Sequence, residues 1–344
     1  MKNLSLNEIA AVLNLDAPAA DVTIESIVTD SRKVRHGALF AALAGERVDG
    51  HNFAESAAGL GAAALLVQRR LDLDIPQLVA DDVLIALGQI GRLLCEQVKP
   101  QVAAITGSNG KTTVKEMISA ILSPSGPLLA TAGNFNNELG LPLTLFGLES
   151  CHQYAVLEMG ASRKGDIDYL ASIARPQVAL ITNIGPAHLK GFGDVAGVAE
   201  AKGEIYQQLH ADGCAIINAD EPYGEQWLAN SSGGSSMSFG LAQHSDVWLQ
   251  QDGSLQTPAG RIEMELALPG LHNRINAAAA TAAALALGIG RDQIQQGLAT
   301  VRPVPGRLNT LKTAAGWTVI DDTYNANPAS LYSALQVLSG LQGK

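Results

Sequence analysis

One segment, VAAITGSNGKTTVKEMISAIL at residues 102–122, constrains the fold more than any other part of the chain. It opens with the apolar run 102–106, continues through a short stretch that contains Gly107 and Gly110, and ends in a helix-forming run. This order predicts a buried β-strand, a tight loop and an α-helix in direct succession. A strand that leads into a helix in this way is typical of α/β proteins with a parallel sheet.

The loop of this segment has the residue types that bind phosphate. Glycines let backbone N–H groups converge on phosphate oxygens, and the start of the helix adds free N–H groups and the positive end of its dipole. Lys111 supplies a point charge, and the hydroxyl of Thr112 is a ligand for Mg²⁺. The spacing is G-x-x-G-K-T-T, because Ile105 stands where the first glycine of the usual G-x-x-x-x-G-K would fall. The alternative is a plain strand-to-helix turn, but the combination favours a phosphate loop formed by Gly107, Ser108, Asn109, Gly110, Lys111, Thr112 and Thr113.

The central part of the chain predicts a doubly wound, mostly parallel sheet. Short runs that are apolar on both faces alternate with helical stretches, as in a parallel sheet covered on both sides. A more polar region at 235–268 predicts antiparallel strands at the domain edge, and an Ala-rich helix follows at 273–288. The apolar runs are 102–106, 154–159, 178–184 and 214–218.

Length and composition predict more than one domain. The chain has 344 residues and 47% hydrophobic composition, which is too long for one comfortable core and too apolar for disorder. Residues 1–82 combine a short amphipathic helix with several strand-like runs and predict a small α/β domain. A helix over 83–98 leads into the central domain, which extends to residue 312.

Charge and cysteine content exclude several classes of protein. The net charge is −10 and the basic residues are dispersed, so no nucleic-acid partner and no anionic membrane surface are expected. Cys95, Cys151 and Cys214 are far apart and predict reduced thiols rather than a metal site or a disulfide. The N-terminus lacks the pattern of a signal peptide, and no run of about 18 apolar residues occurs. We therefore expect a cytoplasmic protein without membrane insertion.

Two residues at strand ends are candidate metal ligands. Glu158 ends the apolar run YAVLEMG, at the carboxyl edge of a parallel strand where ligands of open α/β sheets collect. A carboxylate there binds Mg²⁺ directly or through water. The alternative for Glu158 is an ion pair with a surface cation. His188 lies in the loop after the next strand and is a candidate ligand for a second metal ion, or else a loop histidine with ordinary hydrogen bonds.

Lys202 interrupts an apolar stripe. The helix predicted at 195–209 has apolar residues at Val195, Val198, Ile205 and Leu209, and Lys202 fills the gap between them. An unpaired ammonium on the inward face is costly, so the side chain must extend to water, find a carboxylate or lose its charge. On these grounds alone, a structural lysine that reaches water is favoured over a functional one.

Eight sequence motifs are spread along the chain. They are ITGSNGKTT, TAGNFNNELGLPLTL (131–145), LEMGAS (157–162), NIGPAHLKGFG (183–193), EAKGEI (200–205), PGLHNRINAAAA (269–280), PVPGRL (303–308) and DDTYNANPASL (321–331). Taken together, these motifs resemble those of the Mur ligase family, from about residue 22 to the end. Within that family, the forms NFNNELG and DDTYNANP resemble the branch that joins D-alanyl-D-alanine to a UDP-N-acetylmuramoyl-tripeptide.

The resemblance implies an ATP-dependent ligase of peptidoglycan precursor synthesis that works through an acyl phosphate. It implies that Lys202 is carbamylated, which turns a buried cation into an anion. The resemblance therefore favours a functional role for Lys202 over a structural one. It also implies Mg²⁺ contacts for Thr112, Glu158, His188 and Lys202, adenine or ribose contacts for Asn273 and Asp322, and a γ-phosphate contact for Arg307. The catalytic residues would then be Lys111, Lys202, His188 and Arg307.

The resemblance also assigns residues to the UDP-linked substrate. The segment 29–53 is similar to the uridine-diphosphate-binding element of the family, and other contacts are expected from the NFNNELG and LEMGAS motifs. For each of these polar residues, a role in a turn or a helix cap is the alternative. The expected substrate-binding residues are Ser31, Arg32, His51, Asn134, Asn137 and Ser162.

Members of the family have a third, Rossmann-like domain that binds the incoming amine. Residues 313–344, with a strand at 317–322 and a helix from about Pro328, are expected to be its start, so we expect either a truncated form or one part of a longer chain. We expect this chain to bind the UDP-linked substrate with negligible turnover. We also expect a monomer. Two alternatives to the D-alanyl-D-alanine ligase are a nucleotide- and UDP-binding fragment without catalysis and a ligase similar to folylpolyglutamate synthase. The expected small-molecule partners are the UDP-N-acetylmuramoyl-tripeptide and D-alanyl-D-alanine.

Overall fold

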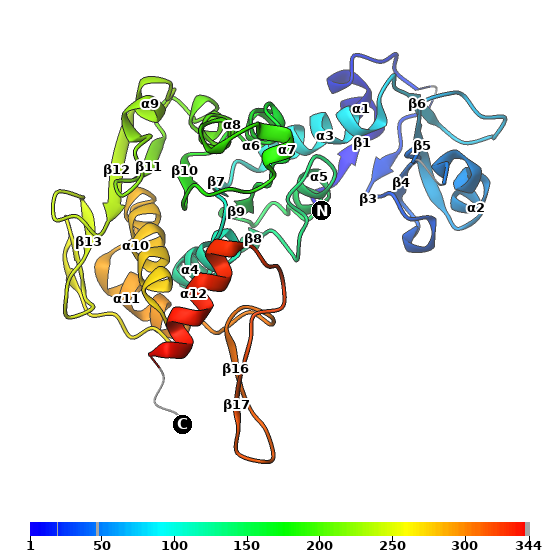
Figure 1. The fold of residues 1–344 in the computed structure, drawn as a ribbon. Coiled ribbons are helices and arrows are strands. Elements are labelled where there is room, and N and C mark those ends of the chain that lie inside the picture. The colour runs from blue at the N-terminus through cyan, green and yellow to red at the C-terminus, as the bar shows by residue number, and fades with distance from the viewer. Residues whose placement is uncertain (19, 46–47, 341–344) are drawn as a thin grey trace. The chain divides into compact units, whose positions relative to one another are not determined.

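The computed structural model describes residues 1–18, 20–45 and 48–340 (Figure 1). Its contacts divide the chain into two compact units, one formed by residues 1–100 and 131–153 and the other by 101–130 and 154–344. The helix at 83–98 thus belongs to the first unit. The domain limits expected at residues 82 and 312 remain predictions.

The first unit is built on a four-stranded parallel sheet with the order β3-β4-β5-β6. Its core includes Phe40, Leu65 and Val67. Two helices of this unit begin at residues whose side chains act as N-caps. Ser5 accepts a hydrogen bond from the backbone N–H of Glu8, and Asp82 accepts two from the first turn of the helix at 83–98. The elements are β1 (Leu4–Ser5), α1 (Leu6–Val12), β2 (Thr23–Ile24), β3 (Ser26–Val28), β4 (Ala38–Ala41), α2 (Ala54–Gly59), β5 (Ala62–Val67), β6 (Gln77–Val79), α3 (Val83–Val98) and α5 (Gly140–Leu145).

The second unit contains a nine-stranded sheet that is parallel from β8 to β13. Antiparallel pairing begins only at β13, so the expectation of antiparallel strands over 235–268 is wrong for β12, which pairs parallel with β11. The polar residues of β12 lie at its exposed start, whereas Phe239 near its end is buried. In sheet order the strands are β15 (Gly260–Ile262), β14 (Leu255–Thr257), β13 (Val247–Leu249), β12 (Ser235–Gly240), β11 (Cys214–Asn218), β10 (Val178–Ile181), β7 (Gln101–Thr106), β9 (Tyr154–Glu158) and β8 (Leu128–Ala130).

Helices cover both faces of this sheet, which confirms the predicted doubly wound α/β class. Alternate strand residues such as Ile105 and Leu180 share one apolar core with α4 (Lys111–Leu122), α10 (Leu271–Ala286) and α11 (Arg291–Thr300). The alternate positions, such as Ala104 and Ala179, are equally buried and point to the other face. That face is covered by α6 (Asp166–Ala174), α8 (Val195–Gln207) and α9 (Gly224–Ala229).

The strand order places the carboxyl end of β7 at a switch point. Its neighbours are β9 on one side and β10 on the other, and all three strands run in parallel. Ligands of open α/β sheets bind in the crevice outside the strand ends at such a point. The loops that follow β7, β9 and β10 therefore converge, and the short helix α7 (Leu189–Phe192) lies in the last of them.

The end of the described chain adds a hairpin and a helix to the second unit. Strands β16 (Asn309–Lys312) and β17 (Thr318–Asp321) pair antiparallel, and α12 (Pro328–Ser339) follows with Asn327 as its N-cap. Across the described ranges, no helix combines the length and apolar character needed to cross a membrane.

Candidate functional site

Thr112 and Glu158 meet at the ends of neighbouring elements. Parallel pairing sets Glu158 of β9 opposite Ile105 of β7, directly before the phosphate loop. Thr112, in the first turn of α4, donates its hydroxyl hydrogen to Glu158 Oε2 at 2.7 Å, and both side chains are buried. The two side chains are thus in direct contact, and a shared Mg²⁺ site at this point remains a prediction.

The backbone of the phosphate loop requires glycine at two points. Gly107 has φ +147°, and a Cβ there would lie 1.9 Å from Thr182 Oγ1. Gly110 has φ +81° and precedes α4, where a Cβ would lie 2.7 Å from Asn276 Oδ1. Among the described residues, no side chain caps the start of α4. The N–H groups of its first turn are therefore available for an anion.

Ser108 and Asn109 are bonded to the loop that follows β10. The backbone N–H of Ser108 donates to Asn183 O, and its hydroxyl exchanges hydrogen bonds with the backbone of Gly185. The N–H of Asn109 donates to Asn183 Oδ1 at 3.0 Å. The N–H groups of Ser108 and Asn109 thus fix the loop to the segment after β10.

Lys111 and Lys202 approach each other inside the site. Lys111 Nζ donates to Gly107 O at 2.9 Å. Burial lowers the pKa of Lys111, an effect that the charge of Glu158 opposes and that of Arg307 reinforces. Burial lowers the pKa of Lys202 to about 7, with a further contribution from the charge of Lys111. Lys202 is only 4% exposed, so its amine does not extend to water as the structural alternative required.

Arg307 joins the site from the segment before β16. Its Nη2 donates to Thr112 Oγ1 at 2.9 Å, and its guanidinium carbon lies 4.1 Å from the ring centroid of Tyr324. Arg307 Nε is buried and has no hydrogen-bond acceptor within the described ranges. A negatively charged group would satisfy this donor, since buried polar groups are normally hydrogen-bonded.

Asn273 lies in the first turn of α10, and Asp322 follows β17. Asn273 is buried and its Nδ2 donates to Pro269 O at 2.7 Å. Asp322 accepts from the backbone N–H of Leu308. Burial lowers the pKa of His272, and the negative charge of Asp322 opposes that shift, which links Asp322 to the residue beside Asn273.

His188 and Ser162 occupy exposed loops of the second unit. His188 has φ +52° and immediately precedes α7. Ser162 donates its N–H and its hydroxyl to Asp166 Oδ2. The two loops touch, because a Cβ on Gly191 would lie 1.9 Å from Ser162 O. In the described ranges, no group of three His, Cys, Asp or Glu side chains forms a ready metal site.

In the first unit, both ring nitrogens of His51 have hydrogen-bond partners within the protein. Its Nδ1 lies 2.6 Å from Asp49 Oδ1, and its Nε2 accepts the backbone N–H of Gln68 at 3.0 Å. This pairing requires the tautomer with the hydrogen on Nδ1. The hydrogen bond from Arg69, followed by those from the backbone and ring of His51, holds the pKa of Asp49 well below its usual range.

The other expected substrate residues of the first unit are more exposed. Arg32 is exposed and binds Asp30 with two hydrogen bonds, which lower the pKa of Asp30 to about 2. Ser31 is half-buried, and Asn134 is exposed. Asn137 accepts the backbone N–H of Gly140 at the start of α5. Asn137 therefore has a structural bond, as the alternative of a cap role anticipated.

Asn183 is a further residue of this loop region that was not predicted to bind a ligand. This residue comes two positions after β10 and binds both polar atoms of the Asn109 peptide. Its position in the sequence could have indicated this role, because it follows the end of β10, a strand that pairs with β7. Glu158 ends β9, the other strand that pairs with β7.

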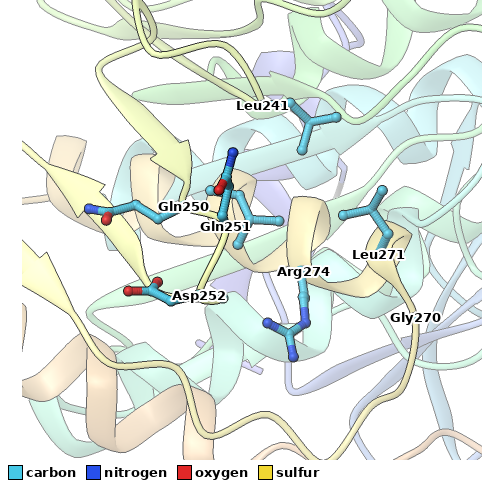
Figure 2. A pocket seen from close by; sticks show the side chains of 9 residues that line it. Leu241, Gln250, Gln251, Asp252, Gly270, Leu271 and Arg274 are labelled. Carbon is cyan, nitrogen blue, oxygen red and sulfur yellow. The ribbon is translucent and has the colours of Figure 1, made fainter.

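A separate hollow of about 630 Å³ lies between the β13–β14 turn and the start of α10 (Figure 2). None of its lining residues was expected to bind ATP or substrate. Its walls are Leu241, Leu249, Gln250, Gln251, Asp252, Gly253, Gly270, Leu271 and Arg274.

Comparisons with known proteins identify the family of the chain. Residues 105–284 match the family model described as Mur ligase middle domain, and residues 23–94 match that described as Mur ligase family, catalytic domain. The UDP-N-acetylmuramoyl-tripeptide--D-alanyl-D-alanine ligase of Escherichia coli K12 is 44% identical over 100% of this chain and 78% of its own length. The enzyme of the same name from Bacillus subtilis 168 is 40% identical over 93% of this chain and 71% of its own.

Solved structures give the same relationship. A crystal structure of MurF from Acinetobacter baumannii superposes with a TM-score of 0.93 at 39% identity, over 100% of this chain and 78% of that one. The MurF ligase of Thermotoga maritima, solved in complex with ADP, superposes with a TM-score of 0.85 at 30% identity, over 93% and 75%. By the matched models, the relatives and the shared architecture, the chain belongs to the Mur ligase family.

Proposed function

We propose that this protein is an ATP-dependent ligase that joins D-alanyl-D-alanine to a UDP-N-acetylmuramoyl-tripeptide. The observation that supports it most is the arrangement of Lys111, Thr112 and Glu158 around the uncapped start of α4, at the switch point of the sheet. A relative from Escherichia coli K12 that is 44% identical to this chain bears the name of that activity.

Nucleotide binding would use the phosphate loop and the residues beside it. The N–H groups of Lys111, Thr112 and Thr113 would bind phosphate oxygens, and the Lys111 ammonium would add a positive charge. The buried and unsatisfied Nε of Arg307 supports a contact with the γ-phosphate. Asn273 and Asp322 would bind the adenine or the ribose. The ADP in the related Thermotoga maritima structure supports this use of the site.

The donor set of the site fits Mg²⁺. Thr112 Oγ1 and Glu158 Oε2 are oxygen ligands 2.7 Å apart, and Mg²⁺ in nucleotide sites takes one or two protein oxygens together with phosphate and water. When bound, the ion would neutralise phosphate charge. His188 and a carbamylated Lys202 are the proposed further ligands.

Carbamylation of Lys202 is supported by its surroundings. Only a neutral amine attacks CO₂, and a pKa of about 7 leaves a large neutral fraction at neutral pH. The carbamate would replace an uncompensated cation beside Lys111 with an anion, which the positive charge of Lys111 stabilises.

The chain's own residues would align two reactants that repel each other. A carboxylate oxygen of the tripeptide attacks the γ-phosphorus of ATP, the bond to ADP breaks, and an acyl phosphate forms. Lys111 and Arg307 would screen the two negative groups as they approach. The amine of D-alanyl-D-alanine then attacks the acyl carbon, and a tetrahedral intermediate expels phosphate to leave the amide.

The UDP-linked substrate would bind the residues assigned from the family resemblance. The exposed Arg32 is suited to a diphosphate, because its guanidinium is only partly engaged by Asp30. The enzyme would act as a cytoplasmic monomer in peptidoglycan precursor synthesis. The substrate-binding set is Ser31, Arg32, His51, Asn134, Asn137 and Ser162.

The proposal is tested by incubating the protein with ATP, Mg²⁺, the UDP-tripeptide and D-alanyl-D-alanine. Detection of the UDP-pentapeptide by mass spectrometry, with phosphate release that requires both substrates, would support the ligase and contradict the expectation of negligible turnover. Binding of ATP and the UDP-tripeptide without product would favour the non-catalytic alternative. Product formed with glutamate in place of the dipeptide, on a folate acceptor, would favour the folylpolyglutamate alternative.

A further inference from the structure

The peptide of Asn109 is fixed from one side by the loop after β10. Asn183 Oδ1 accepts its N–H at 3.0 Å, and Asn183 Nδ2 donates to its carbonyl at 3.0 Å. Thr182 Oγ1 donates to the same carbonyl at 2.6 Å. With both peptide groups engaged, the side chain of Asn109 can leave the loop only in a narrow range of directions.

That side chain is bound by the N-cap of α12. Asn327 Nδ2 donates to Asn109 Oδ1 at 2.7 Å, although the two residues are 218 positions apart. Asn327 Oδ1 accepts the backbone N–H of Ser330 at 2.9 Å and so caps the helix. One amide group therefore joins the phosphate loop to the first turn of α12.

Most of the described apolar side chains of α12 are exposed, and Leu331, Tyr332 and Leu335 are each more than half exposed. Among the described side chains of this helix, Val337 alone is buried, and a Cβ on Gly270 would lie 2.8 Å from its Cγ2. The bond between Asn109 and Asn327 therefore anchors the start of a helix whose described apolar side chains are mostly exposed.

We propose that Asn327 is a positioning residue of the nucleotide site and acts through Asn109. Its amide holds the phosphate loop in the conformation that presents the first N–H groups of α4, and in return the loop orders the first turn of α12. The inference rests on the proposed binding of a nucleotide at this loop. It assigns the side chain of Asn109 to this link rather than to a contact with ATP.

Calorimetry with ADP tests the link through three variants. Asn327→Ser keeps a good N-cap and removes the amide donor, and Asn109→Ala removes the acceptor without touching α12. Each should raise the Kd for ADP by about 2- to 12-fold, the range that one net hydrogen bond allows. The double variant should bind no more weakly than either single one, because all three lose the same bond.

Hydrogen exchange gives a second readout without nucleotide. The N–H of Leu331, which donates to Asn327 O, should exchange faster in Asn109→Ala, although that substitution lies in another element. The matched control is Ser330→Ala, which weakens the capping box but keeps the Asn109 bond. It should speed exchange in α12 and leave the Kd for ADP unchanged.

The results distinguish failure of the positioning role of Asn327 from failure of the proposed function. ADP binding by the unaltered protein with an unchanged Kd in Asn327→Ser and in Asn109→Ala would overturn the positioning role alone. Additive losses in the double variant would do the same. Absence of ADP binding by the unaltered protein would overturn the proposed function and this role together.

Discussion

Thr112 Oγ1 lies 2.7 Å from Glu158 Oε2, although 46 positions of sequence separate the two residues. The contact follows from the strand order, since β7 and β9 pair in parallel and end at the same edge of the sheet. The hydroxyl also accepts a hydrogen bond from Arg307. The oxygens of Thr112 and Glu158 and the guanidinium of Arg307 thus lie together at the start of α4, where a phosphate group would bind.

Replacement of Glu158 should weaken the response to Mg²⁺. Glu158→Gln keeps the shape of the side chain and removes its negative charge, so the Mg²⁺ concentration for half-maximal activity should rise by about 10- to 100-fold. Titration of ADP formation with Mg²⁺ measures it. Glu96→Gln, an exposed change on α3, is the control. An unchanged Mg²⁺ midpoint in Glu158→Gln would show that the carboxylate serves only as a partner of Thr112.

Loss of Lys111 should reduce turnover strongly. Without its charge, the phosphates are uncompensated in a site shielded from water, so Lys111→Ala should lower kcat/KM for ATP by at least ~10²-fold, roughly 3 kcal/mol. Steady-state kinetics with the exposed Lys99→Ala as control measures the effect. Activity within threefold of the unaltered enzyme would contradict the phosphate-loop assignment.

Carbamylation of Lys202 should follow its lowered pKa. The pKa falls from 10.5 to about 7, mainly through burial and further through the charge of Lys111, so the amine is largely neutral above about pH 7. At a fixed pressure of ¹³C-labelled CO₂, the carbamate resonance should therefore grow as the pH rises through 7. It should be missing in Lys202→Arg. Growth only near pH 10 would indicate that the amine keeps an ordinary pKa.

A carboxylate in solution should replace the carbamate in part. Lys202→Ala should be nearly inactive, and acetate should restore some activity because it places an anion in the space left by the side chain. The activity is measured against acetate concentration, with chloride of equal ionic strength as control. If acetate and bicarbonate both have no effect, Lys202 is a structural lysine.

Replacement of His51 should lower the stability of the protein, whereas replacement of Arg32 should weaken binding of the UDP-linked substrate. His51→Ala leaves the N–H of Gln68 without its acceptor, so the free energy of unfolding should fall by about 1–3 kcal/mol. Arg32→Ala should change stability by less than about 0.5 kcal/mol, because the side chain is exposed, but should weaken binding of the UDP-tripeptide. Urea denaturation and calorimetry on both variants give the two quantities. The reverse pattern would exchange the roles of these residues.

Local sequence predicted the elements whose causes are local. The helix predicted over 83–98 is observed as Val83–Val98, between the cap at Asp82 and Pro100, and the strand over 214–218 is observed with the same bounds. The phosphate loop was also predicted, since its glycines, lysine and threonines are adjacent in the chain.

Features that depend on distant partners were not predicted. The strand expected over 178–184 ends at Ile181, because Thr182 and Asn183 turn their side chains to the phosphate loop. Composition could not distinguish parallel from antiparallel pairing for β12, since the polar residues at its start are common to both kinds of strand. The contact between Asn109 and Asn327 spans 218 positions and leaves no periodic signal.

The most direct test of the ligase account is the transfer of oxygen from the tripeptide to phosphate. The UDP-tripeptide is labelled with ¹⁸O in its terminal carboxylate and incubated with the protein, ATP, Mg²⁺ and D-alanyl-D-alanine. Attack of the carboxylate on the γ-phosphorus predicts one ¹⁸O atom in each phosphate released, as read by ³¹P NMR. Phosphate that carries no ¹⁸O would contradict the account, because ATP would then be hydrolysed by water.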